Sequence, residues 1–220
     1  MLSCKNILIS TISVILLIGF VCGSIYISFT TSWIYNYQLS KYETSKIFHP
    51  KINGPLSMES LQLITLEIKK YFINGKNLDP KIITKEKKEI SAFNTRELIH
   101  MKDVHTIVAG VKNTSIISFF ILFSIFLYFI IKKRLKGFLY IVKILEKSSL
   151  FGIIFIIIAG IIILLFFEKL FLLFHKISFA NDYWQLNPEK DFLIVLFPFE
   201  FWVNAVIFIV IASIMLILLS

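Results

Sequence analysis

Three of the four histidines lie beside long apolar stretches of the sequence: His100, His105 and His175. An imidazole has an unperturbed pKa of about 6.5, so it can give or take a proton near neutral pH. Glu97 and Asp103 each stand three residues from His100, which on a helix brings a carboxylate within reach to fix the tautomer of the ring. His175 directly follows an apolar stretch, at the expected depth of lipid headgroups. A lone histidine at a membrane edge is commonly an ordinary polar residue. His100 and His175 together, on the same side, make general acid and base catalysis an equal alternative.

Other reactive patterns are weaker. His100 and His105 are five residues apart and so do not share a helix face, and His49 lies in a turn-like stretch. Asp191 and Glu200 could join the histidines around a metal, but no close-spaced ligand pattern such as H-x-x-x-H occurs. No serine elbow, Cys-His pair, phosphate loop or nucleic-acid signature is found outside the apolar stretches. We therefore expect no metal, no other cofactor and no nucleic-acid partner.

The segment over residues 175–200 also carries groups that could stabilise an oxyanion. Asn181, Tyr183 and the indole N–H of Trp184 are candidate donors for such a charge. Asp191 is a further supporting residue of the same segment. Trp202, at the edge of the last apolar stretch, is typical of an aromatic belt at a membrane surface.

The composition decides the class of protein. Among 220 residues, 57% are hydrophobic and only 17% are charged, which excludes a soluble globular protein. A helix needs roughly 20 apolar residues to cross about 30 Å of hydrocarbon. We predict an all-α integral membrane protein that forms a single membrane domain over residues 1–220. Its four transmembrane helices are expected at residues 7–29, 114–131, 149–174 and 201–219.

The orientation follows from the charge of a short connector. Residues 132–148 contain five lysines and one arginine against a single acid, Glu146, so this connector should be cytoplasmic. Both termini then face the cytoplasm, and the segments 30–113 and 175–200 lie outside the plasma membrane. No small-x-small cleavage site follows the first apolar stretch, so we expect it to stay as an anchor.

The first outer segment should contain an amphipathic helix over residues 57–73. Its apolar positions recur at helical spacing and are Leu61, Ile64, Ile68 and Tyr71 or Phe72. The sequence NGKN ends the pattern. This apolar face needs a cover, which could be the other outer segment or the membrane surface.

A second helix should begin at Asn94, a plausible N-cap with Glu97 three positions later. It would carry His100 and run into the second span. We expect either a bend near Gly110 to Asn113 or an early entry into the membrane with Lys112 reaching back to the surface.

Two longer stretches resemble a known family. The sequences ELIHMKDV, residues 97–104, and FHKISFANDYWQLNPEKDFLIVLFPFEFW, residues 174–202, resemble the two outer-segment signatures of the lipoprotein intramolecular transacylases. The sequence YFINGK and the four-span layout are also similar, so the resemblance covers most of the chain. The two outer histidines of the family fall on His100 and His175. The chain departs from the family at His105, where a lysine is more usual.

The resemblance implies an activity. Such enzymes move an acyl chain from the glyceryl sn-2 oxygen of a diacylated bacterial lipoprotein to the α-amine of its N-terminal cysteine, which gives the lyso-form. We expect one histidine, with His100 favoured, to take the ammonium proton with Asp103 or Glu97 orienting it, and His175 to act as the acid; the roles could be reversed. The expected partners are a diacylated lipoprotein and membrane lipid, and the expected state is a monomer.

Two other classes of protein remain open from the sequence. A non-enzymatic membrane adaptor would tolerate replacement of both histidines, whereas a metal-dependent membrane hydrolase would lose activity in chelator. The use of many Ile, Lys, Asn and Phe residues is typical of an AT-rich genome, such as that of a low-GC Gram-positive bacterium.

Overall fold

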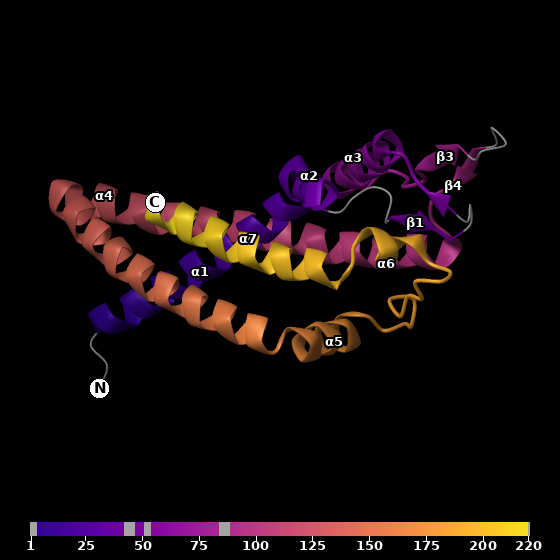
Figure 1. Cartoon of the computed structure of the whole chain (residues 1–220). Coiled ribbons are helices and arrows are strands. Elements are labelled where there is room, and N and C mark those ends of the chain that lie inside the picture. The colour runs from indigo at the N-terminus through magenta and orange to yellow at the C-terminus, as the bar shows by residue number, and fades with distance from the viewer. Residues whose placement is uncertain (1–3, 42–46, 51–53, 84–88, 220) are drawn as a thin grey trace. The chain divides into compact units, whose positions relative to one another are not determined.

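The computed structural model describes residues 4–41, 47–50, 54–83 and 89–219 (Figure 1). The chain divides into two compact units. The first, called the span unit, comprises Met1–Tyr26, Gly110–Leu165 and Val206–Ser220. The second, called the loop unit, comprises Ile27–Ala109 and Phe166–Ala205.

Three helices of the described chain are long and apolar enough to cross a membrane. They are α1 (Cys4–Thr30), α4 (Thr95–Leu165) and α7 (Phe199–Leu218). These helices confirm the prediction that the chain contains apolar helices able to cross a membrane. The predicted limits of the first and last spans, 7–29 and 201–219, lie within three residues of the ends of α1 and α7.

The long helix α4 turns back on itself at Arg134, its one residue with non-helical backbone angles (φ 47°, ψ −133°). Figure 1 shows the two arms that result. Aromatic rings pack across the turn, with the centroids of Phe129 and Tyr140 5.4 Å apart. The backbone stays helical from Gly110 to Asn113, so the first of the two predicted alternatives, a bend there, is absent. The predicted connector, residues 132–148, is helical except at Arg134.

Small side chains allow the helices of the span unit to approach closely. The Ser115 hydroxyl donates to the carbonyl oxygen of Gly19 at 2.9 Å, and a Cβ at Gly19 would lie 3.1 Å from that of Ser118. Such contacts are usual where helices meet in a membrane, because lipid tails give apolar side chains no preference for each other. The apolar cores of this unit comprise Ile12, Leu16, Phe20, Ile141, Ile144, Ile156 and Ile217.

The predicted third span, residues 149–174, is two helices and not one, so that prediction was wrong. Phe166 has φ −117° and ψ 24°, which separates α4 from α5 (Phe167–Ser178). No glycine or proline stands at this position or beside it, so the sequence carries no local signal of the break.

The loop unit is not wholly α-helical, which corrects the predicted all-α class in this region. It holds α2 (Ser32–Lys41), α3 (Met58–Asn74) and α6 (Phe192–Leu196), together with two antiparallel hairpins. In the first hairpin, β1 (Phe48–His49) pairs with β2 (Gly54–Pro55). In the second, β3 (Lys81–Ile83) pairs with β4 (Glu89–Ser91), with Ile82 opposite Ile90. The strands are only two or three residues long, so alternation of side chains cannot reveal them.

The structure confirms the predicted amphipathic helix. The Ser57 hydroxyl caps its first turn by accepting from the Ser60 amide at 3.2 Å, and Gly75 ends it with φ 67°. Its apolar face is fully buried within the loop unit, so protein and not the membrane surface covers this face. Its buried residues are Leu61, Ile64, Thr65, Ile68, Tyr71 and Phe72.

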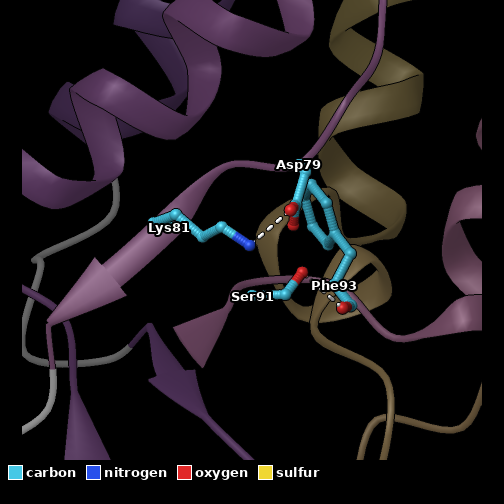
Figure 2. A network of polar contacts seen from close by, with 4 residues as sticks. All are labelled: Asp79, Lys81, Ser91 and Phe93. Atoms are coloured by element: carbon cyan, nitrogen blue, oxygen red, sulfur yellow. Dashed lines mark hydrogen bonds and ion pairs between the residues drawn. The ribbon is translucent and has the colours of Figure 1, made fainter. Parts of the chain in front are cut away.

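The β3–β4 hairpin leads into the start of α4. Figure 2 shows the ion pair between Lys81 and Asp79 and the bond from the Ser91 hydroxyl to the Phe93 carbonyl oxygen, which is 2.9 Å long. An open groove of about 660 Å³ runs beside these residues to Thr95. Phe93 itself is 1% exposed, so it anchors the hairpin in the core just before α4 begins.

The turn at Arg134 makes Gly137 essential. A Cβ at Gly137 would overlap the carbonyl oxygen of Phe129 and lie 2.8 Å from its carbonyl carbon. Because backbone must move, Gly137→Ala should lower the apparent unfolding temperature in detergent. The matched control is Gly110→Ala, since nothing lies within 4 Å of that position. The control should be neutral or stabilise a helix by up to about 1 kcal/mol. Equal unfolding temperatures for both variants would contradict the tight turn.

Candidate active site

The start of α4 is fixed by a capping box, as predicted. The Asn94 side-chain oxygen accepts from the Glu97 amide at 3.1 Å, and Glu97 Oε2 accepts from the Asn94 amide at 2.7 Å. Each group satisfies an amide that the first turn of a helix leaves without a partner. The box therefore places His100 one turn into a well-ended helix.

Asn94 and Glu97 also bind the second outer segment, residues 175–200. Glu97 Oε1 accepts from the Leu193 amide at 2.5 Å, Asp191 Oδ1 accepts from Asn94 Nδ2 at 2.6 Å, and Asp191 Oδ2 accepts from the Asn187 amide at 2.7 Å. Glu97 is 0% exposed and Asp191 5% exposed. Buried carboxylates are stable only when hydrogen bonds replace water, as they do here. Glu97 and Asp191 thus join the two outer segments structurally.

The structure brings His100 and His175 together. Their ring centroids are 6.1 Å apart, although 75 residues separate them along the chain. His100 comes from α4 and His175 from the last turns of α5, and both rings are buried. A pair of imidazoles at this separation can act on neighbouring atoms of one small group.

The tautomer of His175 follows from its hydrogen bond. Its Nδ1 lies 2.7 Å from the carbonyl oxygen of Phe171, one helical turn earlier. A carbonyl oxygen only accepts, so Nδ1 carries the proton and donates, and the lone pair of the neutral ring lies on Nε2. In contrast, Nδ1 of His100 is buried and has no hydrogen-bond partner among the described residues.

Aromatic rings enclose the pair. Phe179 packs edge-on against His100 at 5.1 Å and lies 5.5 Å from His175. Phe171 and Trp184 lie 4.3 Å and 5.2 Å from His175. These rings remove water from the imidazoles, which disfavours their charged forms.

The pKa values reflect this burial. Burial away from water is the main cause that lowers the pKa of His100 to about 4. Repulsion from a protonated His175 lowers this pKa further, whereas the negative charge of Asp103 raises it. Burial also lowers the pKa of His175, while its bond to the Phe171 carbonyl acts in the opposite direction. Both rings are therefore neutral at pH 7, and each disfavours a proton on the other.

Asp103 and Asn181 form a second link between the segments. Asn181 Nδ2 donates to Asp103 Oδ2 at 2.8 Å, and the Asn181 side-chain oxygen accepts from the Tyr183 amide at 3.0 Å. Asp103 thus lies near His100 electrostatically while one of its oxygens holds Asn181. One N–H of the Asn181 amide is committed to this link, which leaves the other for any further acceptor.

Of the remaining candidate donors, Trp184 contacts the pair and Tyr183 is not placed against either histidine. The ring of Trp184 contacts His175, and its indole N–H makes no hydrogen bond within the described part of the chain. Tyr183 is 40% exposed and lies under the Arg96 guanidinium, which is 5.9 Å from the ring centroid. Arg96 also donates to the Asp182 carbonyl oxygen.

The other two histidines have different settings. His49 is 0% exposed in β1, with Nε2 donating to the Ala92 carbonyl at 2.9 Å and its ring 4.4 Å from Phe192. It is the last residue of β1, buried and directly before the turn at Pro50, so the stretch is turn-like as expected. His105 instead packs against α3, 4.9 Å from the Tyr71 ring. Among the described residues, no group of three His, Cys, Asp or Glu side chains could hold a metal ion.

Sequence reasoning missed several contributors to the site. Phe171 and Phe179 lie four residues before and after His175, a spacing that on a helix would have placed them beside it. Arg96 carries no such signal, because its partners come from a loop of irregular structure. The hydrogen bonds of Glu97 and Asp191 to the opposite segment were also not foreseen.

Comparison with known proteins gives three similarities. A family model described as lipoprotein intramolecular transacylase Lit matches residues 10–202. A protein of Aquifex aeolicus (strain VF5), described only as uncharacterized, is 28% identical over 156 residues, which are 70% of this chain and 66% of that protein. The match therefore spans slightly less than two thirds of that relative.

The third similarity is to solved structures. The membrane integral lipoprotein intramolecular transacylase Lit from Bacillus cereus matches with a TM-score of 0.72 at 20% identity, covering 98% of this chain and 91% of that one. A variant of the same protein with a histidine replaced by arginine matches with a TM-score of 0.70, also at 20% identity, covering 98% and 88%. At this identity the structures show the fold, that of a membrane-integral protein. Since the family model covers nearly the whole chain, this protein belongs to the lipoprotein intramolecular transacylase family.

Proposed function

We propose that this protein moves an acyl chain from the glyceryl sn-2 oxygen of a diacylated lipoprotein to the α-amine of its N-terminal cysteine. The observation that carries the proposal is the buried pair of His100 and His175, 6.1 Å apart, with the tautomer of His175 fixed by Phe171. Family membership supports the same reaction. The product is the lyso-form lipoprotein, with an amide on nitrogen and a free glyceryl hydroxyl.

We propose four membrane crossings. The turn at Arg134 divides α4 into two arms, which with α1 and α7 supply them. The basic residues around this turn favour a cytoplasmic location for it. Both termini are then cytoplasmic, and the histidine pair faces outward at the plasma membrane surface. The proposal takes the enzyme to act as a monomer without a cofactor.

His175 is the better base of the two. Its Nε2 lone pair is available because Nδ1–H is committed to the Phe171 carbonyl, and the ring is neutral at pH 7. This reverses the assignment favoured from the sequence, in which His100 took the first proton. In the first step, His175 removes a proton from the cysteine α-ammonium, and the freed amine attacks the ester carbonyl carbon.

The tetrahedral intermediate then collapses. The bond between the carbonyl carbon and the glyceryl oxygen breaks, and the leaving oxygen must gain a proton while the nitrogen loses its second one. His100 lies where it can relay that proton, since its ring faces His175 and its Nδ1 has no partner among the described residues. The reaction therefore balances: an ammonium and an ester give an amide, an alcohol and one proton released to water.

Developing negative charge on the ester oxygen needs donors. The indole N–H of Trp184, the free N–H of Asn181 and the hydroxyl of Tyr183 are the candidates. Such preorganised donors commonly contribute about 3–4 kcal/mol to transition-state stabilisation. Trp184 is the foremost of them, because its ring already contacts His175.

The lipid chains need an apolar path to the histidines. Helix α5, which carries His175, exposes Leu173 (49%) and Ile177 (75%) on its other face. Phe174 is 46% exposed, and its ring lies 5.3 Å from that of His175. Large apolar side chains exposed in this way fit contact with lipid. Because amine and ester belong to one substrate, holding them together can supply much of the rate without a protein nucleophile.

The first test replaces each histidine by glutamine. His100→Gln and His175→Gln should each lower formation of the N-acyl, mono-O-acyl cysteine by at least about 100-fold, the usual contribution of one acid or base. The measurement is mass spectrometry of the N-terminal peptide of a model lipoprotein in a host that makes the diacyl form. His105→Gln is the matched control and should retain activity, since that ring packs on Tyr71.

The same experiment separates the rival functions. Normal lyso-form production by the double variant would contradict histidine catalysis, and an unchanged substrate with wild-type protein would favour the adaptor. Loss of activity on dialysis against chelator, restored by a divalent metal, would favour the hydrolase.

The lowered pKa of His100 makes stability depend on pH. The unfolded chain takes up a proton near pH 6.5, whereas the folded ring does so only near pH 4. Stability from this group is thus complete above about pH 6.5 and is lost as pH falls toward 4, a change of about 3 kcal/mol. His100→Gln should lose less unfolding temperature between pH 7 and pH 5 than wild type, measured in detergent micelles. Equal losses would show that His100 does not titrate in this way.

A further inference from the structure

Helix α2 exposes a pair of stacked aromatic rings. Trp33 is 57% exposed and Tyr37 41% exposed, with ring centroids 5.8 Å apart and planes within 8° of parallel. The Lys41 ammonium lies 5.8 Å from the Tyr37 ring centroid. The opposite side of the helix is buried in the loop unit, through Ile34, Tyr35, Gln38 and Leu39.

Helix α3 also has an exposed apolar stripe, opposite its buried face. Leu63, Leu66 and Ile73 are 55%, 38% and 49% exposed. They are three and seven residues apart, so they share one side of the helix with Lys70 between them. A helix that is apolar on both sides needs two covers, and the loop unit supplies only one.

The two helices are neighbours. The Lys69 ammonium donates to the Ser32 hydroxyl at 2.7 Å, which ties α3 to the start of α2. A shallow groove of about 250 Å³ between the helices is lined by both, including Asn36 and Leu66. We call the exposed residues of these two neighbouring helices, taken together, the α2–α3 surface; they are Trp33, Tyr37, Lys41, Leu63, Leu66, Lys70 and Ile73.

Chain length limits where this surface can lie. The candidate span in α1 ends at Thr30, and Trp33 follows three residues later. Three residues reach at most roughly 11 Å even when fully extended. The headgroup layer on each side of the hydrocarbon is about 5–8 Å thick. Trp33 therefore follows the end of the candidate span closely, within reach of the headgroup layer.

We propose that the α2–α3 surface lies in the phospholipid headgroup layer and fixes the depth of the loop unit. Trp33 and Tyr37 suit this layer because their rings are apolar with one polar atom each. Lys41 and Lys70 can reach phosphates. Glu59 shares the exposed side of α3 but lies in its first turn, so its carboxylate marks the edge of the apolar stripe. The contact is independent of acyl transfer, but it sets the height of His100 and His175, which belong to the same unit.

Trp33 allows a direct test, since the protein has three tryptophans. Trp33→Phe keeps the stacked ring, and the difference in emission between wild type and variant isolates Trp33. Both proteins are placed in nanodiscs of phosphatidylcholine and phosphatidylglycerol. Lipids with a nitroxide near the headgroup, lipids with a nitroxide near the chain ends, and aqueous iodide serve as quenchers. Equal unfolding temperatures of the two proteins establish that the variant is folded.

The expected result is that shallow nitroxide lipids lower the Trp33 emission at least twofold more than deep ones, and more than iodide does. Strong quenching by iodide without quenching by either lipid would place the surface in water and overturn the proposal. Protection from all three quenchers would also overturn it, because a second copy or another protein would then cover the surface.

Discussion

Two buried carboxylates hold the start of α4 against the second outer segment, and the rest of the site depends on that tie. Glu97 accepts from amides of both segments, Asn94 and Leu193, and Asp191 accepts from Asn94 and from Asn187 in its own segment. A buried carboxylate without such partners would cost several kcal/mol, so these bonds are strongly favoured over any looser arrangement. His100 lies one turn after Glu97. Its position therefore follows from this tie.

Burial of the histidines is the next consequence. The aromatic rings that surround them lower both pKa values, and the charge of His175 lowers that of His100 further. Two neutral imidazoles that disfavour positive charge take up at most one further proton near neutral pH, in addition to the N–H that each ring already carries. That behaviour suits a reaction that moves protons singly between an amine and a leaving oxygen. A more exposed pair would bind protons from water and be less ready to accept one from the substrate.

Sequence reasoning succeeded where a long period or a local motif was present. The spacing of Leu61, Ile64 and Ile68 identified α3, and Asn94 with Glu97 identified the start of α4. It failed where the deciding contact was distant. The break at Phe166 has no local marker, and the hairpins are too short to alternate. The pairing of His100 with His175 came from family resemblance, because neither helix reveals its partner in its own sequence.

The hydrogen bonds of Asn181 change the role that its residue type suggests. A side-chain amide beside a histidine suggests an oxyanion donor, yet one N–H of Asn181 holds Asp103, whose negative charge raises the pKa of His100 against the effect of burial. Without that charge, His100 would bind a proton still less readily. In the proposed mechanism, the first role of Asn181 is therefore to keep Asp103 in place. Trp184 faces no such competing demand in the described chain, which favours its indole N–H as the donor to the oxyanion.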